Sequence, residues 1–108
     1  MKIQVLYLDK LKFDAEKTLA SKYLGRIQSS GRKIIDPIVL KQISFKEMDQ
    51  ELISESFNVL LDEKGESLTT IKFTELIFES SNKRINFFIG NTNGFTEIMK
   101  KRANKLLS

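Results

Sequence analysis

The segment INFFIGNTNGF, residues 85–95, decides how this chain of 108 residues folds. Its first five residues form the most hydrophobic run of the chain, and near-continuous apolar strands are typical of a parallel sheet that helices cover on both faces. The glycines and asparagines of residues 90–94 then indicate a loop. Apolar residues at helical spacing follow, so the segment predicts a core strand, a loop and a helix.

The rest of the chain alternates the same two patterns. The expected strands are residues 2–8, 34–40, 57–61 and 85–89; the expected helices begin after Asp14, after Ser44 and after Thr69 or Thr70, and a last helix carries Phe95, Ile98, Met99, Ala103 and Leu106 on one face. This alternation predicts an α/β fold with an open, mostly parallel sheet, helices on both faces and right-handed crossovers.

Local signals refine three of these elements. Pro37 lacks the N–H that a sheet ladder needs, so the strand at 34–40 is expected at an edge or a bulge. Ser44 and Glu47 have the spacing of a capping box, which indicates where a helix begins. The polar residues 62–66, DEKGE, indicate a turn that closes the strand before them.

The composition restricts the chemistry. A chain of 108 residues is expected to form one domain, residues 1–108, because it is too small for two cores. It contains no cysteine and no histidine, which excludes disulfides, thiol nucleophiles, an imidazole base and the commonest zinc ligands. No metal is therefore expected. The N-terminus has no long apolar stretch, so we expect no membrane association and a cytoplasmic location.

The net charge of +4 is unevenly distributed. Residues 1–33 carry eight Lys/Arg and three acids, residues 34–82 carry four and ten, and residues 83–108 carry six and one. If the fold brings the basic ends together, they form one positive face that suits a phosphate backbone. The alternative is a solvated surface with uneven charge.

Candidate site residues follow the two core strands. In open parallel sheets, ligands bind beyond the carboxyl ends of the strands, where residues 62–66 and 90–94 are expected. The Gly90 loop is either a ligand-binding turn or an ordinary connection from strand to helix. The neighbouring Asp62 and Glu63 are either general acid and base groups or solvated carboxylates.

A second candidate is the cationic side of the last expected helix. Lys100, Lys101 and Lys105 lie opposite its apolar face, and Arg102 adjoins them in sequence. They form either a patch that contacts phosphate or the solvated side of an amphipathic helix.

Four segments resemble the ribosomal RNA large-subunit methyltransferase H family. They are MKIQVLYLDKLK at 1–12, YLGR at 23–26, VLLDEKGESLTT at 59–70 and FIGNTNGF at 88–95. Their order and spacing match the family too, and the similarity covers essentially the whole chain, with its weakest part at residues 30–56.

The resemblance implies a SPOUT-type, α/β-knot enzyme. Such an enzyme uses S-adenosylmethionine to methylate N3 of a pseudouridine in large-subunit (23S) ribosomal RNA, and it acts as a homodimer on assembled ribosomes. Carried over by position, Leu61 and Gly90 would line the methyl-donor pocket. Leu61 would supply an apolar wall for the adenine, and Gly90 a position where backbone can approach the cofactor closely. Neither the resemblance nor the residues identify a catalytic base.

Two features depart from the family pattern. Asn91 stands where the family has a second glycine. Leu107 and Ser108 resemble the start of the family's fifth strand, so we expect this chain to lack the final strand, knot and helix. We expect it to be incomplete or inactive alone, and to bind the donor weakly or not at all unless it is extended. We also expect the exposed apolar surface of such a sheet to favour self-association.

Two other functions fit the residues without the resemblance. One is a basic α/β module that binds RNA without catalysis. The other is an unrelated nucleotide-binding domain in which the Gly90 loop holds phosphate.

Overall fold

Strands and helices alternate along the chain as the sequence predicts. The computed structural model describes residues 2–8, 14–30, 38–52, 55–80, 84–90 and 95–108. Within these ranges the elements are β1 (Ile3–Leu8), α1 (Asp14–Ser30), β2 (Val39–Ile43), α2 (Phe45–Leu52), β3 (Phe57–Glu66), α3 (Thr70–Glu79), β4 (Ile85–Ile89), α4 (Glu97–Arg102) and β5 (Lys105–Leu107).

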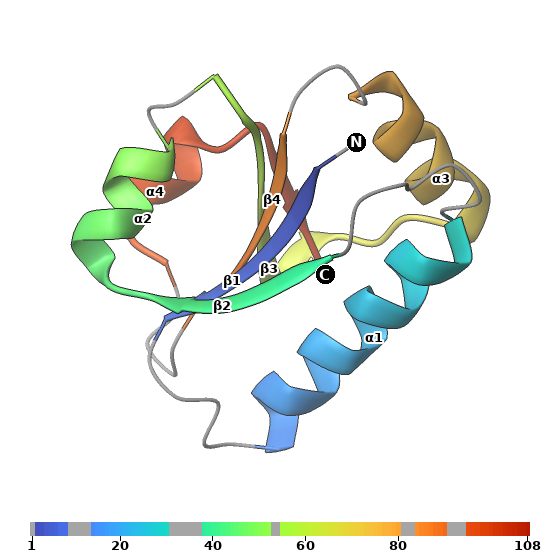
Figure 1. The fold of residues 1–108 in the computed structure, drawn as a ribbon, viewed down its shortest axis with the longest axis horizontal. Coiled ribbons are helices and arrows are strands. Elements are labelled where there is room, and N and C mark those ends of the chain that lie inside the picture. The colour runs from blue at the N-terminus through green and yellow to red at the C-terminus, as the bar shows by residue number, and fades with distance from the viewer. Residues whose placement is uncertain (1, 9–13, 31–37, 53–54, 81–83, 91–94) are drawn as a thin grey trace.

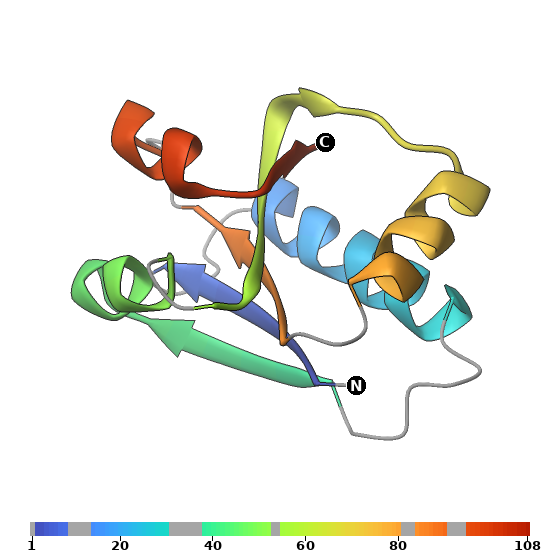
Figure 2. The same ribbon diagram turned by 90° about the horizontal axis from the view of Figure 1, so that it is seen from above.

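The described strands form one parallel sheet in the order β2-β1-β4-β3-β5 (Figure 2). The central strand is β4, and all five of its residues are buried. This confirms that INFFI is a core strand. A strand buried on both faces must be covered by helices from two sides, because it has no face that suits water.

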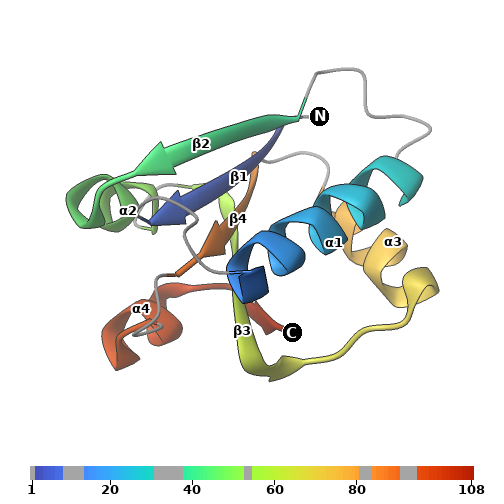
Figure 3. The ribbon, with the colours of Figure 1, turned by 90° about the horizontal axis from the view of Figure 1, so that it is seen from below.

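Helices cover both faces of the sheet. Figure 1 shows α1 and α3 on one side of the strands and α2 and α4 on the other, and Figure 3 shows the same separation from below. Alternate side chains of each strand enter opposite layers: Val5 packs in the layer of α1 and α3, and Leu6 in the layer of α2 and α4. The predicted fold class, an open parallel α/β sheet with helices on both faces, is confirmed.

The edge position of β2 is confirmed, although the strand begins later than expected. It spans Val39–Ile43 rather than residues 34–40, and Pro37 lies outside the described residues. Of its five residues only Ile43 is buried. An edge strand with one buried side chain depends mostly on its ladder with β1, in which Ile43 pairs with Leu8.

Two of the predicted helix starts are also confirmed. The Glu47 N–H donates to Ser44 Oγ at 3.2 Å, and the Ser44 N–H donates to Glu47 Oε1 at 3.3 Å, which is the reciprocal pattern of a capping box. Thr69, one of the two expected caps, accepts a hydrogen bond from the Lys72 N–H at 3.2 Å.

The expected turn at 62–66 is wrong as the end of a strand, because β3 continues to Glu66. Leu107 pairs with both Leu61 and Glu66, so the residues between these two form a large bulge in β3. The Lys64 N–H donates to Asp62 Oδ1 at 3.0 Å inside the bulge. The polar sequence therefore does bend the chain, but the strand resumes afterwards.

The last expected helix is shorter than predicted. It ends at Arg102, Ile98 is 63% exposed, and Leu106 belongs to β5 rather than to a helical face. Asn104 explains the change, since its N–H donates to the Asn58 carbonyl at 2.8 Å and its side-chain oxygen accepts from the Asn58 N–H at 2.7 Å. These two bonds attach the chain to β3 and lead into β5. A strand is present as expected, but it begins at Lys105 and ends at Leu107, where it was expected to start.

Candidate functional site

The two strands that carry the candidate site end side by side. Leu61 of β3 is the register partner of Ile89 of β4. Gly90 directly follows Ile89, so it lies beside Asp62 at the carboxyl edge of the sheet. Residues 28 positions apart in sequence are thus brought together by the parallel pairing, as the sequence predicts.

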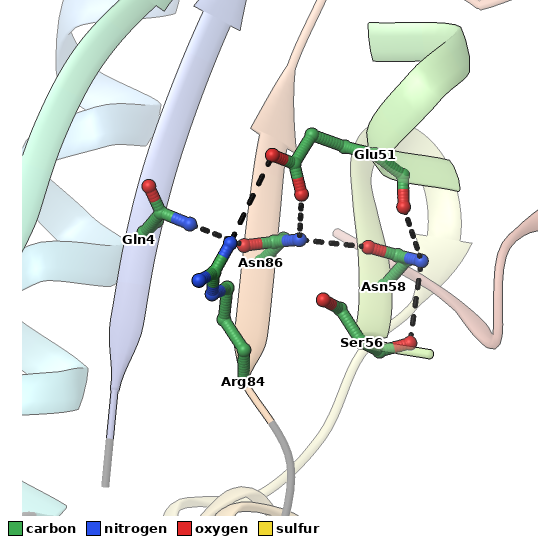
Figure 4. Close-up of polar contacts among 6 residues, drawn as sticks. All are labelled: Gln4, Glu51, Ser56, Asn58, Arg84 and Asn86. Carbon is green, nitrogen blue, oxygen red and sulfur yellow. Dashed lines mark hydrogen bonds and ion pairs between the residues drawn. The ribbon is translucent and has the colours of Figure 1, made fainter. Parts of the chain in front are cut away.

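A ladder of three amide side chains fixes this register from the opposite end of the strands (Figure 4). Gln4 Nε2 donates to Asn86 Oδ1 at 3.1 Å, and Asn86 Nδ2 donates to Asn58 Oδ1 at 3.0 Å. Asn58 and Asn86 are 1% and 0% exposed, so a slipped register would leave buried amides without partners. Leu61 and Ile89 lie three residues beyond these asparagines, so the ladder also fixes their pairing.

Glu51 of α2 and Arg84 complete the network in Figure 4. Asn86 Nδ2 also donates to Glu51 Oε2 at 3.1 Å, and a guanidinium nitrogen of Arg84 lies 3.9 Å from Glu51 Oε1. Sequence reasoning missed this network. A signal was present, because FNVLL and INFFI each carry an asparagine at the second position of an otherwise apolar strand.

Both residues that the resemblance assigns to the donor site are covered. Leu61 is 2% exposed and packs in the layer of α1 and α3, and Gly90 is buried as well. The structure therefore brings the pair together but does not present Leu61 as an open apolar wall. A ligand at this edge reaches the two residues only if the groups that cover them move.

Gly65 lets β5 approach the bulge of β3. A Cβ built on Gly65 would lie 2.4 Å from the carbonyl carbon of Leu107 and 2.7 Å from its nitrogen and oxygen. Such distances are far below van der Waals contact, so only glycine permits this approach. The LDEKG motif thus has a structural role in holding Leu107 next to Leu61.

The YLGR motif also has a structural role. The Tyr23 hydroxyl donates to the Ser108 carbonyl, and the Arg26 guanidinium donates to the Leu68 carbonyl at 2.7 Å. The same guanidinium stacks 5.3 Å from the ring centre of Phe73. Burial raises the pKa of Tyr23, and the neighbouring Arg26 partly opposes that shift. These contacts connect α1 to α3 and to the end of β5.

Lys100 of α4 lies next to the site. Its ammonium is 3.9 Å from Asp62 Oδ2 and 3.7 Å from Glu97 Oε1. Asp62 is therefore engaged by a cation and by the Lys64 N–H, rather than free as a general base. The side chain of Glu63, its predicted partner, lies outside the description, as do Asn91 and the rest of the loop at 91–94.

In the described part of the chain, the cations of the first and last helices lie apart. The strands β1 and β4 are neighbours, but α1 covers one face of the sheet and α4 covers the other (Figure 1). The cations of α1 and of α4 therefore lie on opposite sides of the molecule, because alternate connections place successive helices on opposite faces.

Two further features of the described residues concern metal-binding groups and membrane-spanning helices. In the described ranges, no three His, Cys, Asp or Glu side chains gather in a way that could hold a metal ion. The helices seen there are also too short or too polar to span a bilayer.

Comparison with known proteins identifies the family. The family model described as "Predicted SPOUT methyltransferase" matches residues 1–108. The ribosomal RNA large subunit methyltransferase H of Malacoplasma penetrans is 33% identical, over all of this chain and 79% of its own length. The protein of that name from Trichlorobacter lovleyi is 30% identical, over all of this chain and 78% of its own length. The one from Campylobacter concisus is 32% identical, over 86% of this chain and 56% of its own length.

This family match also argues against an unrelated nucleotide-binding domain. Two motifs on which the sequence resemblance rests build the edge: LDEKG lies around the bulge of β3, and Gly90 directly follows β4. The chain belongs to the SPOUT methyltransferases, and within them to the ribosomal RNA large subunit methyltransferase H family.

Proposed function

We propose that this chain is an S-adenosylmethionine-dependent methyltransferase that acts on N3 of a pseudouridine in large-subunit (23S) ribosomal RNA. We also propose that it works as a homodimer in the cytoplasm. Membership of the family and the names of its relatives support the class of reaction and the RNA substrate. The finer assignment of donor, atom and nucleotide rests on the resemblance of its motifs.

The observation that carries the proposal is the adjacency of Leu61 and Gly90 at the carboxyl edge of β3 and β4. This is where open parallel sheets bind ligands. The residues there suit a nucleoside chemically, because Gly90 has no side chain and permits close approach of backbone, while the buried Leu61, Ile89 and Leu107 make the interior behind it apolar.

The role of the chain in this proposal is to hold and orient the reactants. When bound, S-adenosylmethionine supplies a methyl group on a sulfonium sulfur. The edge of β3 and β4 holds the nucleoside part of the donor, and burial there excludes water from it. Fixed placement of the donor beside its acceptor supplies much of the acceleration in such reactions.

Calorimetric titration of S-adenosylmethionine into the wild type and Gly90→Val tests the donor site. We expect weak binding by the wild type, and we expect Gly90→Val to lose at least about tenfold in affinity, which is about 1.4 kcal/mol. Gly25→Ala is the matched control, since nothing lies within 4 Å of its added methyl group. Thermal unfolding without ligand shows whether each variant is folded, and Gly90→Ala replaces the valine variant if it is not. Unchanged affinity in a folded Gly90 variant contradicts the site.

A second experiment tests the reaction. Ribosomes that lack the modification are incubated with the protein and with S-adenosylmethionine that carries a labelled methyl group, and the labelled nucleotide is located by mass spectrometry. The proposal predicts label on N3 of a pseudouridine of the large-subunit RNA. Label on another base or on ribosomal protein contradicts the assigned substrate.

Light scattering tests the proposed homodimer and the expected self-association. We expect a molecular mass of twice 12.5 kDa or more. A monodisperse monomer at the concentrations of the other assays contradicts both.

A further inference from the structure

The last turn of α4 concentrates positive charge at the surface. Lys100, Lys101 and Arg102 follow one another there, and the only carboxylate of the helix is Glu97. Lys101 and Arg102 are exposed, and neither forms an ion pair with any residue in the described ranges. Two adjacent cations are thus available to an anionic partner.

This turn is tied to the candidate donor edge. Lys100 lies 3.9 Å from Asp62, the residue directly after Leu61. A helix rises about 1.5 Å per residue, so Lys101 and Arg102 begin within roughly 3 Å of Lys100 along the helix axis. The exposed cations therefore start close to Lys100, on the face of the sheet that α2 and α4 cover.

The exposed side of α4 also carries an apolar residue. Ile98 is 63% exposed, and it lies three and four residues before Lys101 and Arg102, which places the three on one face of the helix. Cations beside an exposed apolar side chain suit a nucleic acid, which offers phosphates next to sugars and bases. Arginine can grip a phosphate with two N–H groups, and lysine meets it as a point charge.

We propose that Lys101 and Arg102 form the surface by which this protein holds the phosphate backbone of its RNA substrate, on the layer of α2 and α4 that borders the donor edge. This rests on the proposed function for the identity of the polymer. A purely structural role is the competing explanation, because cations in the last turn of a helix also stabilise its dipole.

The test is binding of a fluorescein-labelled oligouridylate and of an RNA hairpin, each followed by fluorescence anisotropy over a range of salt concentrations. The variant Lys101→Gln/Arg102→Gln is compared with Lys22→Gln/Lys72→Gln. The control removes the same charge from exposed positions on α1 and α3, which cover the opposite face of the sheet. Each phosphate contact with a single strand contributes about 0.7 to the slope of log affinity against log salt. We expect the α4 variant to lose about 1.4 from the slope and the control to lose much less.

Three outcomes overturn the proposal: equal losses in both double variants, an unchanged slope in the α4 variant, or no RNA binding by the wild type. A lower melting temperature of the α4 variant with an unchanged slope supports the structural role. Donor binding is measured separately on the same samples, so the two proposals fail separately. If donor binds but the slope is unchanged, only the RNA surface is wrong; if the slope falls but donor does not bind, only the donor site is wrong.

Discussion

Replacing Gly65 by alanine tests the contact that holds β5 against the bulge of β3. The added methyl carbon would lie 2.4 Å from the carbonyl carbon of Leu107. The obstacle is backbone, which cannot rotate aside as the tip of a side chain can. The protein must therefore either shift β5 or release it.

The magnitudes decide between these responses. Overpacking of this kind costs about 1–3 kcal/mol when the structure shifts to accept the methyl group. Release of β5 exposes Leu107, now 0% exposed, at a cost of about 1.5–3 kcal/mol. It also breaks the hydrogen bonds of Asn104 to Asn58 and of Ser108 to Glu66, which contribute about 1 kcal/mol each. A shift is cheaper than release, so we expect Gly65→Ala to lose about 1–3 kcal/mol of unfolding free energy.

Urea unfolding followed by circular dichroism measures this loss, and Gly25→Ala is the control. Gly25 lies in α1 with nothing within 4 Å of an added methyl group, so the same change there should stabilise the protein by about 0.5–1 kcal/mol. Hydrogen exchange at the Ser108 amide, which donates to Glu66 at 3.0 Å, should become faster in Gly65→Ala alone. If Gly65→Ala is as stable as the wild type, or if both variants shift in the same direction, the Gly65–Leu107 contact is wrong.

Three further predictions concern the network, the buried tyrosine and a helix cap. Asn86→Ala leaves the buried Asn58 amide short of a partner and should lose about 1–3 kcal/mol in urea unfolding; a double-mutant cycle with Asn58→Ala that shows no coupling contradicts the ladder. Since burial raises the pKa of Tyr23 above its ordinary 10.0, the native state holds that proton more tightly, and the stabilisation is complete below pH 10 and is lost as pH rises through the raised pKa. Unfolding free energy should therefore fall more steeply above pH 10 in the wild type than in Tyr23→Phe, and parallel profiles would argue against the burial. Thr69→Ala should cost about 1 kcal/mol in thermal unfolding, whereas Thr70→Ala, one residue into α3, should cost less; the reverse order would show that the cap is misassigned.

Local patterns predicted most of the fold because they depend on neighbours in sequence. The apolar run INFFI can bury its side chains on both faces only in the middle of a sheet that helices cover on both sides. The Ser44 and Glu47 pair caps its own helix. The carboxyl edge was predictable for the same reason, since parallel strands that alternate with helices must end together.

The differences all arise from contacts between distant residues. Residues 62–66 have the composition of a turn, and only the approach of Leu107 to Gly65 and Glu66 turns them into a bulge. Residues 103–107 keep helical spacing, but Asn104 bonds to Asn58, 46 positions earlier in the chain, and begins a strand instead. The burial of Leu61 likewise depends on the layer formed by α1 and α3, which no local pattern describes.

The most direct test of the central claim is a titration of the isotope-labelled protein with S-adenosylmethionine, followed by two-dimensional amide NMR spectra. Binding at the carboxyl edge of β3 and β4 predicts that the amide signals of Asp62 and Gly90 move first and furthest, while those of Asn58 and Asn86, at the other end of the same strands, stay in place. If the signals of Asp62 and Gly90 do not move at saturating donor, or if the largest changes cluster at the amino ends of the strands, the assigned donor site is wrong.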